Sequence, residues 1–136
     1  MIEILVNIDV SDMGAAERFY CSAFSLHVAR RIGDGAVELV GATSNIYLLA
    51  NDEGSKASRM SDSRRSYDRH WTPIHLDFVV ESLEGAIEQS IAAGAVQEQP
   101  VRNNSWGRIA LMSDPFGHGY CLIEFSEAGY DAIATS

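Results

Sequence analysis

From residue 4 to residue 10, apolar and polar side chains alternate along the chain, which predicts a β-strand with two distinct faces. Asp12 follows as a helix-capping residue, and apolar residues then recur on one face of a helix that extends to Phe24. Three short strands, separated by turn residues, are predicted next, at 28–32, 37–40 and 46–49. The first half of the chain therefore reads as a strand, a helix and three strands.

The second half repeats this order. Alternation from 74 to 80 predicts a strand, Ser82 is a helix cap, and an apolar stripe ends at Gly94. Three more strands are predicted at 95–101, 108–112 and 120–125. Shifting the chain by seventy positions superposes the two strand-to-helix units and places Asn7 on Asp77. We therefore predict an internal duplication within one domain, with a first module at 1–51, a loop at 52–72, a second module at 73–126 and a tail at 127–136.

The segment from 51 to 69 is polar and has no periodicity, so it is predicted to be a long loop. It holds half of the ten basic residues of the chain, namely Lys56, Arg59, Arg64, Arg65 and Arg69. One interpretation is a mobile, solvated linker. The other is a lid whose arginines meet an anionic substrate.

Composition excludes several classes of function. Apolar residues make up 46% of the chain and charged residues 21%, as in ordinary globular proteins. The net charge of −9 argues against binding to nucleic acid or to an anionic membrane surface, and it is compatible with a cationic or neutral small ligand. The start of the chain has no signal-peptide pattern, and the two cysteines do not form a disulfide framework. We expect a cytoplasmic protein with reduced thiols.

The duplicated strand–helix–three-strand module resembles the vicinal oxygen chelate superfamily of glyoxalases, bleomycin-resistance proteins and extradiol dioxygenases. Two local motifs support the resemblance: Val10-Ser11-Asp12-Met13 followed by Phe19-Tyr20, and Ser113-Asp114-Pro115-Phe116-Gly117-His118. The similarity covers the chain from Leu5 to Phe125. It implies an α+β fold in which two βαβββ modules form a curled mixed sheet around a cavity, and it implies a homodimer.

In this superfamily four inward side chains hold a divalent metal, one from the first strand and one from the last strand of each module. The corresponding positions here are Leu5, His75, Cys121 and a residue near Tyr47 or Leu48. His75 is an ordinary ligand and Cys121 suits only a softer metal, whereas Leu5 offers a hydrocarbon. Strand alternation places Glu124 on the face opposite Cys121. We therefore assign no metal ligands and expect no cofactor, with a divalent metal as the less favoured alternative.

His75 and Asp77 are two apart on a predicted strand, so they share a face. A carboxylate beside an imidazole can orient it as a general base, and the alternative is a structural hydrogen-bonded pair. Our first hypothesis is a protein that binds a small organic molecule in a metal-free cavity. The residues expected to line that cavity are Leu5, Asn7, Tyr47, His75, Asp77, Trp106 and Cys121. The alternatives are a divalent-metal-dependent lyase, isomerase or dioxygenase, and a metal-free acid–base enzyme that uses His75 and Asp77.

Overall fold

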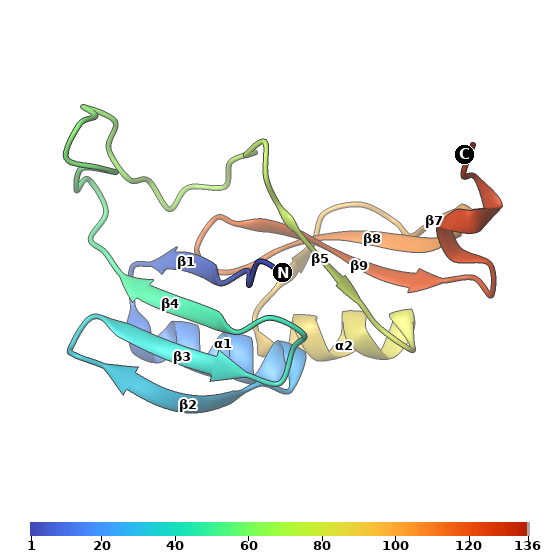
Figure 1. Cartoon of the computed structure of the whole chain (residues 1–136), viewed down its shortest axis with the longest axis horizontal. Helices are drawn as coiled ribbons and strands as arrows, with labels where there is room; N and C mark the ends of the chain where they lie inside the picture. Colours follow the sequence, from blue (N-terminus) through green and yellow to red (C-terminus); the bar gives the residue numbers. More distant parts are fainter. Residues whose placement is uncertain (136) are drawn as a thin grey trace. The chain divides into compact units, whose positions relative to one another are not determined.

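The computed structural model describes residues 1–135 and divides the chain into two compact units, Met1–Asp68 and Arg69–Ser136. Within the described residues, each unit holds one α-helix and one β-sheet of mixed strand direction (Figure 1). The α+β class with a helix and several strands in each half is confirmed, and the strands are divided between two sheets. Within residues 1–135, no helix is both long enough and apolar enough to cross a membrane.

The first unit is a four-stranded sheet with the order β1-β4-β3-β2. Its elements are β1 (Val6–Val10), α1 (Met13–Phe24), β2 (His27–Ile32), β3 (Ala36–Val40) and β4 (Ile46–Ala50). The Asp12 carboxylate accepts a hydrogen bond from the Ala15 amide and so caps α1, as the sequence predicts. The buried side of α1 carries Phe19 and Tyr20 and packs against β4, and Leu48 and Val10 are fully buried in the core of this unit.

The second unit is a five-stranded sheet in which β5, β9, β8 and β6 follow one another and β7 also pairs with β8. Its elements are β5 (Leu76–Val79), α2 (Leu83–Ala93), β6 (Val96–Gln97), β7 (Arg102–Asn104), β8 (Gly107–Ser113), β9 (Gly119–Phe125) and the short helix η1 (Gly129–Ala132). Ser82 caps α2, and Gly94 ends it in the left-handed conformation. Met112 and Leu122 are fully buried in the core of this sheet.

The strand predicted at 95–101 is wrong in its extent. Only β6, Val96–Gln97, of the predicted stretch is a strand, the chain after it, which includes Pro100, is not paired as a strand, and β7 begins beyond it at Arg102. Proline has no N–H to donate to a ladder, which explains the interruption. The turn predicted around Asn103 and Asn104 is also displaced, because β7 includes both and the tight turn falls at Ser105 and Trp106.

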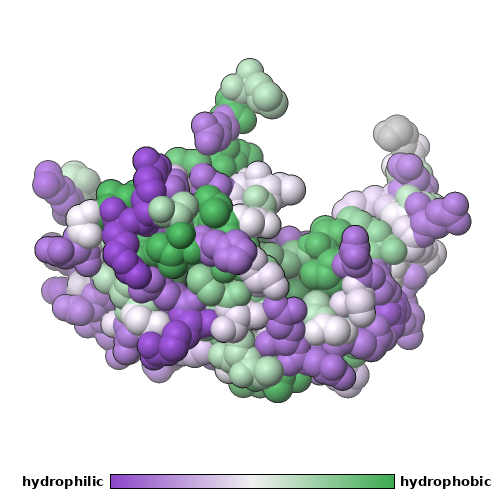
Figure 2. All heavy atoms as spheres, turned by 90° about the horizontal axis from the view of Figure 1, so that it is seen from below, coloured by the Kyte–Doolittle hydropathy of each residue, from purple (hydrophilic) through white to green (hydrophobic). Residues whose placement is uncertain are grey.

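The hairpin between β7 and β8 depends on Gly107. Its φ is +148°, and a Cβ atom there would lie 2.4 Å from the backbone oxygen of Glu124 on β9. Only glycine allows β8 and β9 to approach this closely at that point. On the face drawn in Figure 2, apolar residues form separate clusters among polar ones.

Candidate functional site

A pocket of about 370 Å³ lies within the second unit. Its lining residues are Trp71, His75, Gln99, Pro100, Arg102, Ile109, Leu111 and Cys121. Leu111 pairs with Cys121 across β8 and β9, and Arg102 pairs with Ile109 across β7 and β8, so the sheet register places these side chains on one face. Apolar side chains form much of this wall, and polar groups converge at a few points, which is the usual make-up of a small-molecule site.

Three potential metal ligands meet at this pocket. The ligand atoms of His75, Asp77 and Cys121 all lie within 4.8 Å of one another. Asp77 is the cross-strand partner of Cys121, and His75 precedes β5 by one residue. The structure thus brings the predicted pair His75 and Asp77 together with the predicted Cys121.

The His75 ring contacts the Asp77 carboxylate, with Nε2 3.2 Å from Oδ1. An imidazole that turns Nε2 toward a carboxylate can carry its proton on Nε2, which leaves Nδ1 as an acceptor. Both side chains keep about two fifths of their surface exposed, at 41% and 39%. In that tautomer Nδ1 can accept a hydrogen bond from a ligand.

The Cys121 thiol is a poor nucleophile. Burial, and then the negative charge of Asp77 and a hydrogen bond to it, raise the pKa of this thiol to about 11. The protonated form therefore predominates at neutral pH, and the thiolate that attacks electrophiles is scarce. In this environment Cys121 is a wall residue or a ligand for a metal that displaces its proton.

The rim of the pocket is held by an arginine at the end of the long loop. Arg69 donates to both carboxylate oxygens of Glu98, at 2.6 Å from Nε and 2.8 Å from Nη2. Its guanidinium also lies 4.8 Å from the centre of the Trp71 ring. A Cβ atom at Gly119 would come within 2.4 Å of Nη2, so glycine is needed there for the guanidinium to approach. Arg69 therefore joins the Trp71 side of the pocket to the segment that carries Gln99.

The first unit has a polar row across the equivalent face of its own sheet. Asn7, Tyr47, Glu38 and Arg30 are successive cross-strand partners on β1, β4, β3 and β2. The Tyr47 hydroxyl donates to Glu38 at 2.5 Å, and Arg30 binds both carboxylate oxygens of Glu38. Hydrogen bonds from Arg30 and then Tyr47 lower the pKa of Glu38 to about 2. Glu38 is thus ionised and fully engaged at neutral pH.

The strand register also decides whether Tyr47 or Leu48 is the first-module counterpart of Cys121. Asn7 pairs with Tyr47 as Asp77 pairs with Cys121, so Tyr47 is the counterpart of Cys121. Leu48 points to the other face, where it is fully buried. The counterpart position therefore carries a phenol that is already bound to Glu38.

The other predicted site residues lie elsewhere. Leu5 and Asn7 are exposed in the first unit, and their part in a ligand site stays a prediction. Trp106 packs against Phe125 and Tyr130, with ring centres 6.3 and 5.3 Å apart, and among the described residues it is not part of the pocket wall. Glu124 points away from Cys121 as predicted, because its carboxylate accepts hydrogen bonds from Arg108 and from the first amide of α2.

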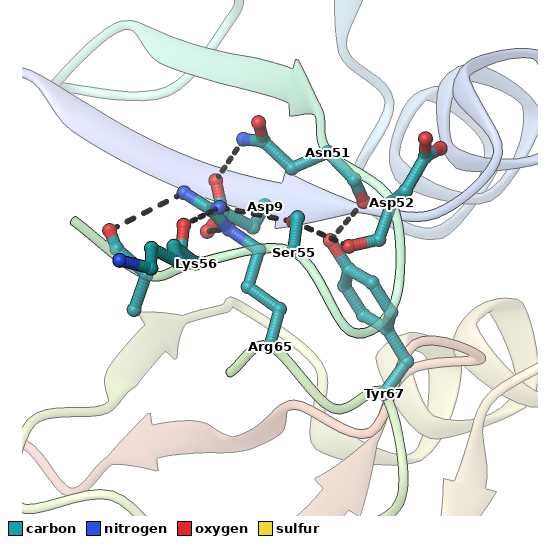
Figure 3. Close-up of polar contacts among 8 residues, drawn as sticks. Asp9, Asn51, Asp52, Ser55, Lys56, Arg65 and Tyr67 are labelled. Atoms are coloured by element: carbon teal, nitrogen blue, oxygen red, sulfur yellow. Dashed lines mark hydrogen bonds and ion pairs between the residues drawn. The ribbon is translucent and has the colours of Figure 1, made fainter. Parts of the chain in front are cut away.

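Part of the long loop is fastened to the first unit rather than free. Arg65 donates to the Asp9 carboxylate at 2.8 Å and to Ser55, and Asp9 also accepts from Asn51 (Figure 3). The Tyr67 hydroxyl donates to the backbone oxygen of Asn51. Arg65 and Arg69 are paired with carboxylates of the protein itself. At these two positions the loop is therefore neither a freely solvated linker nor a lid that offers an unpaired arginine to a substrate.

Sequence reasoning missed most of the pocket wall, including Gln99, Arg102, Ile109 and Leu111. Alternation on β8 could have placed Ile109 and Leu111 on one face, although it could not tell which face is open. No periodic pattern in the sequence indicates that the strand is interrupted at Pro100 and that Arg102 then pairs with Ile109 on the pocket face.

Comparison with known families matches residues 5–123 to the model of the glyoxalase-like domain. A comparison with curated protein sequences finds no significant match.

Solved structures with the same fold include the fosfomycin resistance protein FosX of Listeria monocytogenes, at 18% identity and a TM-score of 0.71 over 94% of this chain and 95% of that one. A glyoxalase-related enzyme from Fulvimarina pelagi has 15% identity and a TM-score of 0.70, over 91% and 87% of the two chains. A lactoylglutathione lyase from Agrobacterium tumefaciens has 18% identity and a TM-score of 0.63, over 91% and 92%. Since the family model spans most of the sequence, this chain belongs to the glyoxalase-like domain family of the vicinal oxygen chelate superfamily.

Proposed function

We propose that this protein binds a small organic molecule in the pocket of its second unit and that binding requires no metal. The observation that carries the proposal is the pocket itself, about 370 Å³ in volume, with Trp71, Ile109 and Leu111 as apolar walls. His75 and Arg102 supply the convergent polar groups that give such a site its orientation. A volume of this size accommodates one or two fused rings with substituents.

A pocket-filling substitution tests this proposal. Ile109→Trp places an indole on the pocket face of β8, and Ile32→Trp makes the same change on the exposed edge strand β2 of the first unit. A library of small aromatic molecules is screened by thermal shift. We expect ligands that raise the Tm of the wild type and of Ile32→Trp but not that of Ile109→Trp. Equal shifts in all three proteins would place binding outside the pocket and contradict the proposal.

A metal-dependent lyase, isomerase or dioxygenase is the second candidate, and the cluster of His75, Asp77 and Cys121 favours it. An imidazole nitrogen, a carboxylate oxygen and a thiolate sulfur suit Zn²⁺ with three protein ligands and an open position, and they suit Mg²⁺ or Ca²⁺ poorly. Bound there, a metal would act as a Lewis acid on an oxygen of the ligand. A FosX structure from Listeria monocytogenes was determined with Mn(II) and a dihydroxypropylphosphonic acid, so metal binding does occur on this fold.

Metal analysis separates the two candidates. Protein purified without chelator is assayed for metal content, and its Tm is followed across Mg²⁺, Mn²⁺, Fe²⁺, Ni²⁺ and Zn²⁺. Because metal binding must displace the proton of Cys121, an authentic site should lose affinity as the pH falls. One metal per chain that is lost in both His75→Ala and Cys121→Ala would reject the metal-free proposal. Homodimer formation and a cytoplasmic location stay predictions, and light scattering tests the first.

A further inference from the structure

Arg102 is the one arginine among the described residues that line the pocket, and like Arg18, Arg59 and Arg64 it is not part of an ion pair within residues 1–135. Five arginines, Arg30, Arg31, Arg65, Arg69 and Arg108, form ion pairs with carboxylates of the protein. Among residues 1–135, Arg102 has no carboxylate within ion-pair distance, although acidic residues outnumber basic ones by 19 to 10. It is exposed and lines the pocket.

The position of Arg102 directs its charge into the pocket. Its cross-strand partner Ile109 is itself part of the pocket wall, so both side chains project from the same face of the sheet. Among the described residues that line the pocket, Arg102 is the one Lys, Arg, Asp or Glu side chain.

A guanidinium binds a carboxylate through two parallel hydrogen bonds, which are among the strongest that a side chain makes. The remaining wall suits a flat apolar body, since Trp71 is 65% exposed and lies near Pro100, Ile109 and Leu111 around the same volume. The acceptor Nδ1 of His75 adds a place for a hydroxyl or N–H of the ligand.

We propose that the pocket selects flat, largely apolar molecules that carry a carboxylate, and that Arg102 binds this carboxylate. This inference rests on the proposed function and narrows it. It differs from the expectation from net charge, since a total of −9 is compatible with a cationic or neutral ligand whereas the arginine in the pocket wall favours an anionic one.

Three ring-matched probes test the inference: naphthoate, naphthamide and naphthylmethylammonium, titrated by isothermal calorimetry. We expect the wild type to bind naphthoate at least tenfold more tightly than naphthamide, and the ammonium compound most weakly. Arg102→Gln should remove the preference for naphthoate while it retains the binding of naphthamide, which also shows that the variant is folded. Arg59→Gln makes the same change in net charge in the first unit and should leave all three affinities unchanged.

The outcomes distinguish the two proposals. If the probes bind the wild type without preference for the anion, or if Arg102→Gln leaves that preference intact, the inference about ligand class is overturned and the binding pocket stands. If none of the probes binds the wild type, the proposed function fails, and the inference fails with it.

Discussion

The ion pair between Arg69 and Glu98 should stabilise the second unit and the rim of its pocket together. Its side chains are 27% and 23% exposed, and two charge-assisted hydrogen bonds of 2.6 and 2.8 Å join them. Exposed pairs contribute about 0–1 kcal/mol, and breaking a fully buried pair costs about 3–5 kcal/mol. The intermediate burial places Glu98→Gln at about 1–2 kcal/mol of lost unfolding free energy, or a Tm lower by roughly 4–8 °C.

Gly119→Ala should lower the unfolding free energy by nearly the same amount as Glu98→Gln, because it displaces Arg69 from the same ion pair. A Cβ atom would lie 2.4 Å from Nη2 of Arg69 and 3.0 Å from Cζ, so the flexible guanidinium must move and release Glu98. Since both substitutions break one interaction, the double variant should lose little more than either single variant. Glu127→Gln removes the same charge at an exposed site and serves as the control.

The assay is urea unfolding followed by tryptophan fluorescence, because both tryptophans, Trp71 and Trp106, lie in the second unit. The measurement is repeated as the pH is lowered. Arg69 lowers the pKa of Glu98, so the ion pair contributes fully above the unfolded pKa of about 4.3 and its contribution is lost as the pH falls through the folded value. The gap between wild type and Glu98→Gln should therefore close in acid. Additive losses in the double variant, or a gap that is constant with pH, would refute this reasoning.

Three further predictions follow from the other contacts. Gly107→Ala should lower the unfolding free energy by about 2–4 kcal/mol in urea, because the new Cβ meets backbone atoms rather than a movable side chain. The control is Gly35→Ala, which should be nearly neutral because no atom lies within 4 Å of its new Cβ. Asp9→Asn should loosen Arg65, and faster amide hydrogen exchange across residues 52–68 would report it. The stabilising effect of Glu38 should be complete above a pH of about 4.3 and vanish as the pH falls toward 2, so the acid loss of stability should be smaller in Glu38→Gln.

Much of the fold could be predicted from the sequence because its signals are local. The alternation before Val10, the capping residues Asp12 and Ser82, and the glycine that ends α2 each act within a few residues of the chain. The correspondence between the two halves could also be predicted from the sequence, since a shift of seventy positions aligns Asn7 with Asp77. In the structure these two residues occupy equivalent positions in their sheets, opposite Tyr47 and Cys121.

The rest of the site depends on contacts between residues far apart in sequence. Arg69 and Glu98 are 29 residues apart, and no pattern near either one indicates the partner. The sequence predicts Trp106 in the cavity wall, whereas in the structure its ring packs against that of Tyr130 in the C-terminal tail. The place of Arg102 in the pocket could not be predicted, because the strand is interrupted at Pro100. Beyond that residue, the alternation of side chains between two faces no longer indicates which face a residue occupies.

The most direct test of the central claim is a nuclear magnetic resonance titration of the isotope-labelled protein with naphthoate, followed residue by residue. We expect the shift changes to concentrate on the pocket wall, at the amides of His75, Arg102, Ile109, Leu111 and Cys121. Changes that centre on the first unit, or that spread evenly over the surface, would contradict a ligand pocket in the second unit.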